Sequence, residues 1–201
     1  MCSRLTAALI TFSVVLFGSY TAQWNQPIEP YRVVSNLYYV GTNYLASFLI
    51  TTPEGSVLIN PNYQESVPLI RRNIEKLGFR FSDIKIILIS HAHDDHAAGC
   101  ALAQKLSGAK LLVMDADVAE MENGGTSDFQ YSDMRWPATR VDRVLHDGDH
   151  VSLGGAILTA HLTPGHTKGC TTWTTEIQQG GRLQHVVIVG SPNVNPGYKL
   201  V

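Results

Sequence analysis

The first half of the chain shows apolar patterns that predict strands, then a helix, then a buried strand. β-Branched and aromatic residues dominate 31–40, and a Thr-Pro-Glu-Gly turn joins the apolar runs 46–51 and 56–60, which together predict a β-meander. From 67 to 77, apolar residues recur every three or four positions, the spacing of an amphipathic helix. The run 84–88 is almost wholly aliphatic, as expected of a strand covered on both faces.

The second half begins with helix and strand patterns and returns to strands. We expect a helix over 97–106, a strand over 110–114, a short helix over 115–121 and a long loop over 122–137. The remaining predicted strands form a second meander and a last hairpin, over 141–145, 149–153, 156–162, 171–177 and 185–189. This order predicts an α/β fold in which two sheets pack together with helices outside.

A cluster of metal-ligand side chains follows the strand at 84–88. The sequence 91–96 reads His-Ala-His-Asp-Asp-His and holds three imidazoles and two carboxylates. Such groups are costly to bury unless they are hydrogen-bonded or bound to a cation. Zinc accepts both imidazole nitrogens and carboxylate oxygens as ligands. The residues that we expect to bind metal are His91, His93 and His166 for a first zinc, and Asp95 and His96 for a second. His166 qualifies because it lies on the Pro-Gly turn at 163–167.

The other histidines and Asp94 are weaker candidates. Asp94 is expected to face outward or to cap the helix that follows. We interpret four histidines as structural, although His161 could reach the site from its strand: His146, His150, His161 and His185.

The expected ligands predict a hydrolytic reaction. Zinc lowers the pKa of bound water toward about 7, so a metal-bound hydroxide can attack an amide or ester carbonyl without a covalent enzyme intermediate. Asp95 would orient the water and take its proton. No Ser or Cys nucleophile with a base partner is evident, and Ser90 and Ser191 are candidates by position alone.

Length, charge and the N-terminal residues indicate the number of domains, the classes of partner and the cellular compartment. The chain has 201 residues and a net charge of -2, which suits one domain and gives no support to nucleic-acid binding. Residues 1–22 predict a secretory signal peptide cleaved after Ala22, with 23–201 as the mature domain; the alternative is an uncleaved anchor. After export Cys100 and Cys170 could pair with each other, pair with another chain or stay free.

The cluster matches the His-x-His-x-Asp-His signature of the metallo-β-lactamase superfamily. The stretches 77–93, 145–149, 162–173 and 195–200 are similar to subclass B3 metallo-β-lactamases. The resemblance implies an αββα sandwich, two zinc ions and hydrolysis of β-lactam antibiotics in the periplasm, conferring resistance. We expect a monomer without stable membrane association. Subclasses B1 and B2 place a zinc-binding Cys near Gly190, where this chain has none.

Two departures from the B3 pattern shape the remaining expectations. A sixth ligand, a histidine, follows the Pro-Gly-Tyr stretch in B3 enzymes, whereas this chain ends at Val201. We therefore expect a sandwich missing its C-terminal part, low stability and weak activity. Hydroxyl residues after Gly190 contact substrate in B3 enzymes; the candidates here are Ser191 and Asn193. The competing functions are another exported hydrolase of this fold, acting on a lactone, thioester or phosphodiester, and a non-catalytic metal-binding protein.

Overall fold

The structure is a computed structural model that describes residues 19–199. Most of the predicted signal peptide, residues 1–18, lies outside the described residues. The α-helices are α1 (Ser19–Trp24), α2 (Val67–Lys76), α3 (Asp94–Ala97), α4 (Cys100–Ser107) and α5 (Val118–Asn123). Three single-turn 3-10 helices are η1 (Gln64–Ser66), η2 (Phe81–Asp83) and η3 (Asp115–Asp117).

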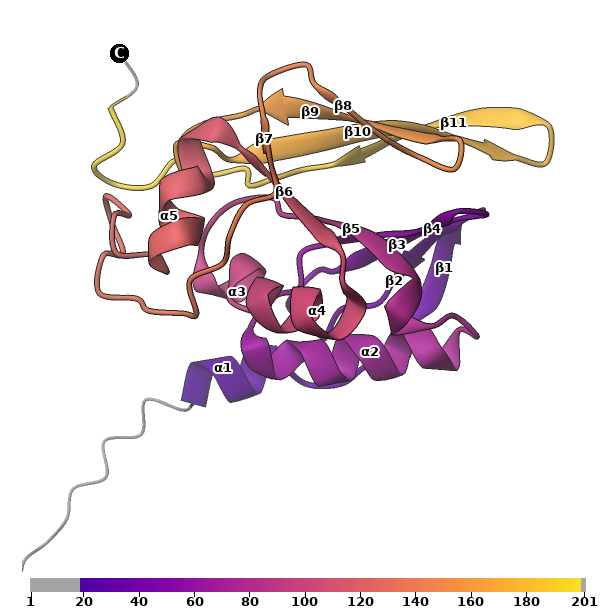
Figure 1. Cartoon of the computed structure of the whole chain (residues 1–201), viewed down its shortest axis with the longest axis horizontal. Coiled ribbons are helices and arrows are strands. Elements are labelled where there is room, and N and C mark those ends of the chain that lie inside the picture. Colours follow the sequence, from indigo (N-terminus) through magenta and orange to yellow (C-terminus); the bar gives the residue numbers. More distant parts are fainter. Residues whose placement is uncertain (1–18, 200–201) are drawn as a thin grey trace, which may run out of the picture.

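Two β-sheets lie face to face, with α2 and α4 on the outer side of the larger one (Figure 1). The seven-stranded sheet runs in sequence order through β1 (Tyr31–Val34), β2 (Leu37–Tyr39), β3 (Phe48–Thr52), β4 (Gly55–Ile59), β5 (Ile84–Leu88), β6 (Lys110–Met114) and β7 (Arg143–Leu145). The four-stranded sheet has the order β11 (Arg182–Ile188), β10 (Thr171–Gln179), β9 (Ala156–Leu162), β8 (His150–Leu153). The first four strands pair antiparallel, and β4 to β7 pair parallel.

Strand alternation divides the buried apolar residues between two cores. On β4, Leu58 faces the helices, while Val57 and Ile59 face the second sheet. The helix-side core also takes Ile70 and Ile74 from the apolar face of α2. The inter-sheet core is built around the fully buried Trp173, Leu88 and Leu158. The α/β sandwich predicted from the sequence is therefore confirmed.

Three predicted elements were wrong in detail. The strand at 31–40 is two strands, because Ser35 adopts a φ of 44° and turns the chain. The helix expected over 97–106 is the separate helices α3 and α4. Strand β7 was assigned to the second meander, but Arg143 pairs with Leu112 of β6, so β7 extends the first sheet.

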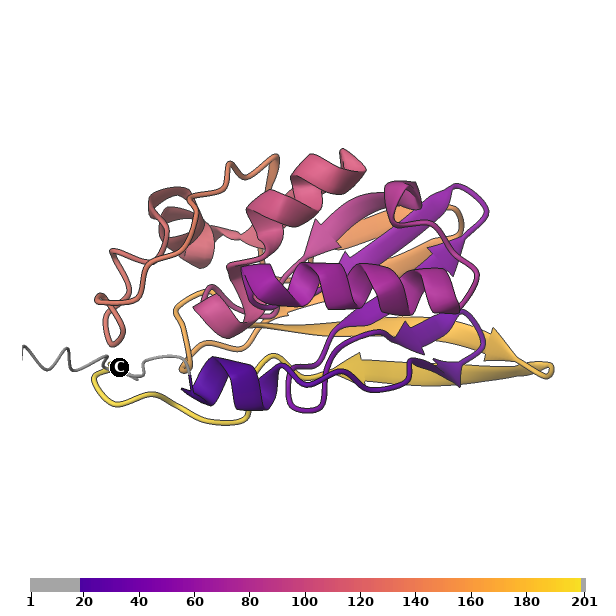
Figure 2. The same ribbon diagram turned by 90° about the horizontal axis from the view of Figure 1, so that it is seen from below.

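Helices cover only one outer face of the sandwich within residues 19–199 (Figure 1). The outer face of the four-stranded sheet carries exposed apolar side chains, among them Ile157 and Val187. No helix in this part of the chain combines the length and apolar character needed to cross a bilayer. Helix α5, the loop after it and the C-terminal residues gather at one end of the molecule (Figures 1 and 2), where β5 delivers the histidine cluster.

Candidate metal centre

The loop that carries the cluster is anchored at its first residue. The backbone N–H of Ser90 donates to Oδ1 of Asn60 over 2.7 Å, and the Asn60 amide donates to the Ser90 hydroxyl over 2.9 Å. The carbonyl of Ser90 accepts from the backbone N–H of Thr171 over 2.7 Å. Ser90 is buried, and its N–H, carbonyl and hydroxyl each make a hydrogen bond, so its hydroxyl has a structural role and is not placed as a nucleophile.

Three imidazoles converge beyond this anchor. One ligand atom each from His91, His93 and His166 lies within 4.8 Å of the others. Nδ1 of His93 and Nε2 of His166 are 3.1 Å apart, close to the separation of about 3.3 Å between two ligands of a tetrahedral zinc with bonds of about 2.0–2.1 Å. Both ring nitrogens of His91 are buried without a normal hydrogen bond inside residues 19–199, which is the condition of a ligand rather than a packed side chain.

A second group of ligand atoms adjoins the first at His91. Ligand atoms of His91, Asp95 and His96 also lie within 4.8 Å of one another. The rings of His91 and His96 are 4.0 Å apart between centroids, and Nε2 of His96 is 3.7 Å from Oδ2 of Asp95. Helix α3 starts at Asp94 itself, so Asp94 stands in its first turn and the expected capping role was wrong. The two groups share His91, so the second group adds Asp95 and His96 to the three imidazoles of the first.

Burial keeps the imidazoles neutral. It lowers the pKa of His91 well below the ordinary value, and the neighbouring His96, His93 and His166 lower it further. The backbone of Gly190 raises this pKa, but by less than burial lowers it. Burial likewise lowers the pKa of the other three. A neutral ring offers a lone pair to a metal, whereas a protonated ring offers none. The site therefore favours a bound cation over bound protons.

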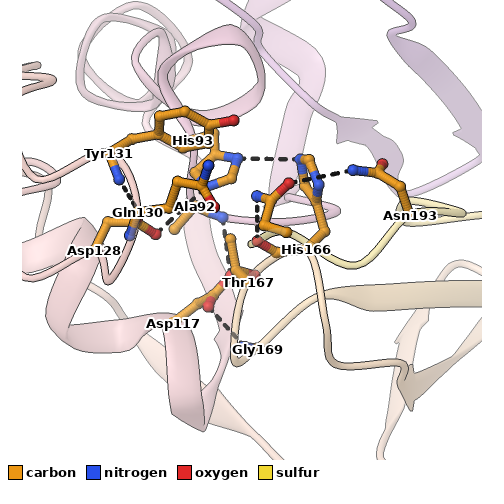
Figure 3. Close-up of polar contacts among 11 residues, drawn as sticks. Ala92, His93, Asp117, Asp128, Gln130, Tyr131, His166, Thr167, Gly169 and Asn193 are labelled. Carbon is orange, nitrogen blue, oxygen red and sulfur yellow. Dashed lines mark hydrogen bonds and ion pairs between the residues drawn. The ribbon is translucent and has the colours of Figure 1, made fainter. Parts of the chain in front are cut away.

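Asp117 joins the two loops that carry the histidines, a role that its sequence context does not signal (Figure 3). Its Oδ2 accepts from the Ala92 N–H over 2.9 Å and from the Thr167 hydroxyl over 2.7 Å. Its Oδ1 accepts from the Gly169 N–H over 2.7 Å. Burial raises its pKa to about 6. One carboxylate thus holds the 91–93 loop against the 166–169 loop.

The long loop after α5 brings Asp128 to the opposite side of His93 (Figure 3). Oδ2 of Asp128 is 3.3 Å from Nε2 of His93, and both side chains are almost completely buried. The ring of Tyr131 meets the His93 ring edge to face at 5.1 Å. The sequence predicts a loop here that is long enough to be functional, but neither its period nor its composition points to one residue.

The remaining candidates lie at the rim of the site or away from it. Ser191 donates its hydroxyl to Asn193 over 2.7 Å, and Asn193 donates to Asn195 over 3.2 Å. Asn195 in turn donates to the carbonyl of His166 over 2.8 Å. His161 bonds Thr174 on the second sheet instead of joining the cluster. Partners outside the cluster also occupy His146, His150 and His185. Cys100 and Cys170 are both buried and free.

Fold and site together define a class of protein. A sequence profile of the metallo-β-lactamase superfamily matches residues 41–179, and the chain belongs to that superfamily. It resembles subclass B3 enzymes in particular. The native FEZ-1 metallo-β-lactamase from Legionella gormanii is 55% identical, with a TM-score of 0.84, over 88% of this chain and 69% of that chain.

The chain is also similar to more distant members of the superfamily. The class B3 di-zinc metallo-β-lactamase LRA-12 from an Alaskan soil metagenome is 37% identical over 85% of this chain and 66% of that one, with a TM-score of 0.81. Hydroxyacylglutathione hydrolase of Acidiphilium cryptum is 31% identical over 43% of this chain. The chain spans 29% of that relative's length and 39% of a second hydroxyacylglutathione hydrolase, from Rhodopseudomonas palustris.

Proposed function

We propose that this protein is a zinc-dependent hydrolase that opens the amide bond of β-lactams. The proposal is carried by one observation: four further ligand side chains meet around His91, whose two ring nitrogens are buried without a normal hydrogen bond among residues 19–199. The likeness to FEZ-1 directs the substrate choice. The side chains that would hold the first zinc are His91, His93 and His166, and those for the second are Asp95 and His96.

The chain's own groups divide the chemical work. Zinc, when bound, supplies a Lewis acid that polarises the substrate carbonyl and lowers the pKa of water. Asp95 would orient the attacking water and accept its proton, because its side chain stays partly exposed at the rim of the site. The imidazoles, being neutral, would hold the cation without cancelling its charge, which would then be available to stabilise a developing oxyanion.

A chelator experiment tests the proposal. The zinc-loaded protein should hydrolyse a carbapenem and a cephalosporin, followed by loss of ultraviolet absorbance, and lose that activity with EDTA. Added zinc should restore it. Turnover that survives complete zinc removal would contradict the zinc mechanism.

The curated relatives motivate one alternative substrate. Hydroxyacylglutathione hydrolases act, by name, on a thioester of glutathione. Assaying a hydroxyacylglutathione beside the two β-lactams separates the hypotheses. Turnover of the thioester without turnover of either β-lactam would move the assignment to that class.

We propose that Ser191 and Asn193 contact the substrate. They are the first two residues of a chain of hydrogen bonds that continues through Asn195 to the carbonyl of His166. Their hydroxyl and amide can donate to a substrate carboxylate. Ser191→Ala and Asn193→Ala should each raise KM severalfold and leave kcat within about twofold, because they remove binding that is equal in ground and transition states. Steady-state kinetics on a cephalosporin decide this. An unchanged KM in both variants would argue against the assignment.

Export to the periplasm completes the proposal. It rests on the residue pattern of 1–22. Fractionation of a bacterial host that expresses the gene, with N-terminal sequencing of the exported product, tests the compartment and the cleavage after Ala22.

A further inference from the structure

We infer that Asp128 is a positioning residue that fixes the tautomer of His93, so that Nδ1 of His93 faces the metal. The inference rests on the proposed zinc centre but not on the identity of the substrate. It concerns a residue from the long loop after α5, 35 positions from its partner in the chain.

The loop presents the Asp128 carboxylate in one fixed orientation. Oδ1 accepts two backbone N–H groups, from Gln130 over 2.8 Å and from Tyr131 over 2.6 Å. That leaves Oδ2 directed at Nε2 of His93, 3.3 Å away. Both side chains are at most 5% exposed, so water does not compete for these positions. The carboxylate is therefore preorganised as an acceptor.

His93 donates its Nε2–H to this carboxylate. A neutral imidazole carries a single N–H, and the buried carboxylate oxygen beside Nε2 holds that proton on Nε2. A proton on Nε2 leaves the lone pair on Nδ1, and Nδ1 is the atom 3.1 Å from His166. Metal-bound histidines commonly donate their second N–H to a carboxylate, which fixes ring and tautomer.

Asp128→Asn provides a sharp test because it keeps size but supplies only one oxygen. If that oxygen stays with Gln130 and Tyr131, the new NH₂ faces Nε2 of His93 and favours the wrong tautomer. If it turns to His93, the NH₂ meets two backbone donors. Either arrangement should weaken zinc binding about 10–100-fold, measured by competition with a chromophoric chelator. Asp133→Asn, an exposed carboxylate on the same loop, is the matched control and should bind zinc normally.

A direct reading of the tautomer completes the test. Long-range ¹H–¹⁵N NMR of the metal-free protein, with His93 assigned through a His93→Gln variant, should show the Nε2–H form in the wild type. Asp128→Asn should shift it toward Nδ1–H where the amide oxygen stays with Gln130 and Tyr131. A wild-type Nδ1–H form, or zinc affinity in Asp128→Asn within twofold of wild type, overturns the inference. The wild-type spectrum decides even if Asp128→Asn fails to fold, and it does so whatever the β-lactam assay gives.

Discussion

Asp117 shows how much of the centre depends on a residue that binds neither metal nor substrate. Its two oxygens accept three hydrogen bonds from Ala92, Thr167 and Gly169, and it is 1% exposed. A Cβ on Gly169 would lie 2.6 Å from the Asp117 carboxyl carbon, so glycine is required for the approach. The relative position of the two histidine loops is thus set by one buried side chain.

Asp117→Ala should lower the free energy of unfolding by about 3 kcal/mol or more, because it leaves three buried donors without an acceptor at roughly 1–3 kcal/mol each. Urea denaturation of the metal-free protein measures the change. Asp115→Asn, on the same 3-10 turn but half-exposed, should stay within about 0.5 kcal/mol. Equal stability of Asp117→Ala and wild type would show that the loops are held elsewhere.

At the scale of elements, the start of α4 packs against the loop that follows β4. Gly99 donates its N–H to the carbonyl of Asn62 over 2.7 Å. A Cβ at Gly99 would lie 2.7 Å from the Pro61 carbonyl oxygen and 2.9 Å from that of Tyr63. Since both neighbours are backbone, the contact leaves no room to adjust, and α3 with Asp95 and His96 is held by it.

Gly99→Ala should therefore destabilise the protein by about 1–3 kcal/mol through overpacking at the N-cap of α4. It should also weaken zinc binding at Asp95 and His96, since α3 must move. Thermal unfolding and zinc titration measure the two effects. Lys105→Ala, on the exposed face of α4, is the control and should change neither. Higher stability in Gly99→Ala would mean that the neighbouring backbone can yield to the added methyl group.

At the scale of the whole molecule, the buried imidazoles couple stability to pH. The histidines whose pKa is lowered are His91, His93, His96 and His166. Below the ordinary histidine pKa of about 6.5, these histidines bind protons in the unfolded chain but not in the folded chain, so acid favours unfolding. Asp94 and Asp117, with pKa values raised to about 6, act oppositely: their contribution is present at low pH and lost as pH rises through about 6.

The free energy of unfolding of the metal-free protein should fall as pH drops from about 7.5 to 6, by up to about 1.4 kcal/mol per pH unit for each proton taken up. Urea denaturation at several pH values gives the slope. His91→Gln should make the slope shallower, whereas His185→Gln, on an exposed strand, should not. A wild-type slope of zero or of opposite sign would contradict the burial argument.

The outer face of the four-stranded sheet makes a separate prediction. Ile157 and Val187 are 54% and 59% exposed there, pointing away from both cores. Exposed apolar patches bind hydrophobic dyes, so the double variant Ile157→Thr, Val187→Thr should bind less anilinonaphthalene sulfonate than wild type. Zinc binding should be unchanged. Val144→Thr, equally apolar but on β7 of the other sheet, is the control; dye binding that follows Val144 instead would place the patch elsewhere.

Local patterns in the sequence were enough to predict most of the elements. Period-two and three-to-four spacings identified the first hairpin, α2, β5 and β6, because each pattern lies within one short segment. The residue types in 91–96 likewise indicated a metal before any coordinates, since His and Asp at that density need a cation. The roles assigned to those residues stay predictions until zinc binding is measured.

Only the tertiary structure decided which strands share a sheet and which distant residues reach the centre. Strand β7 joined the first sheet because its partner is β6, a pairing that no local pattern records. Asp117 and Asp128 reach their partners across 25 to 52 residues. The spacing of apolar residues shows which side of a segment is buried. Whether two loops form a hydrogen bond depends instead on where the packed sheets place the strand ends from which those loops start. The sequence by itself therefore determined the metal-binding chemistry, and the packing of the sheets determined what holds it in place.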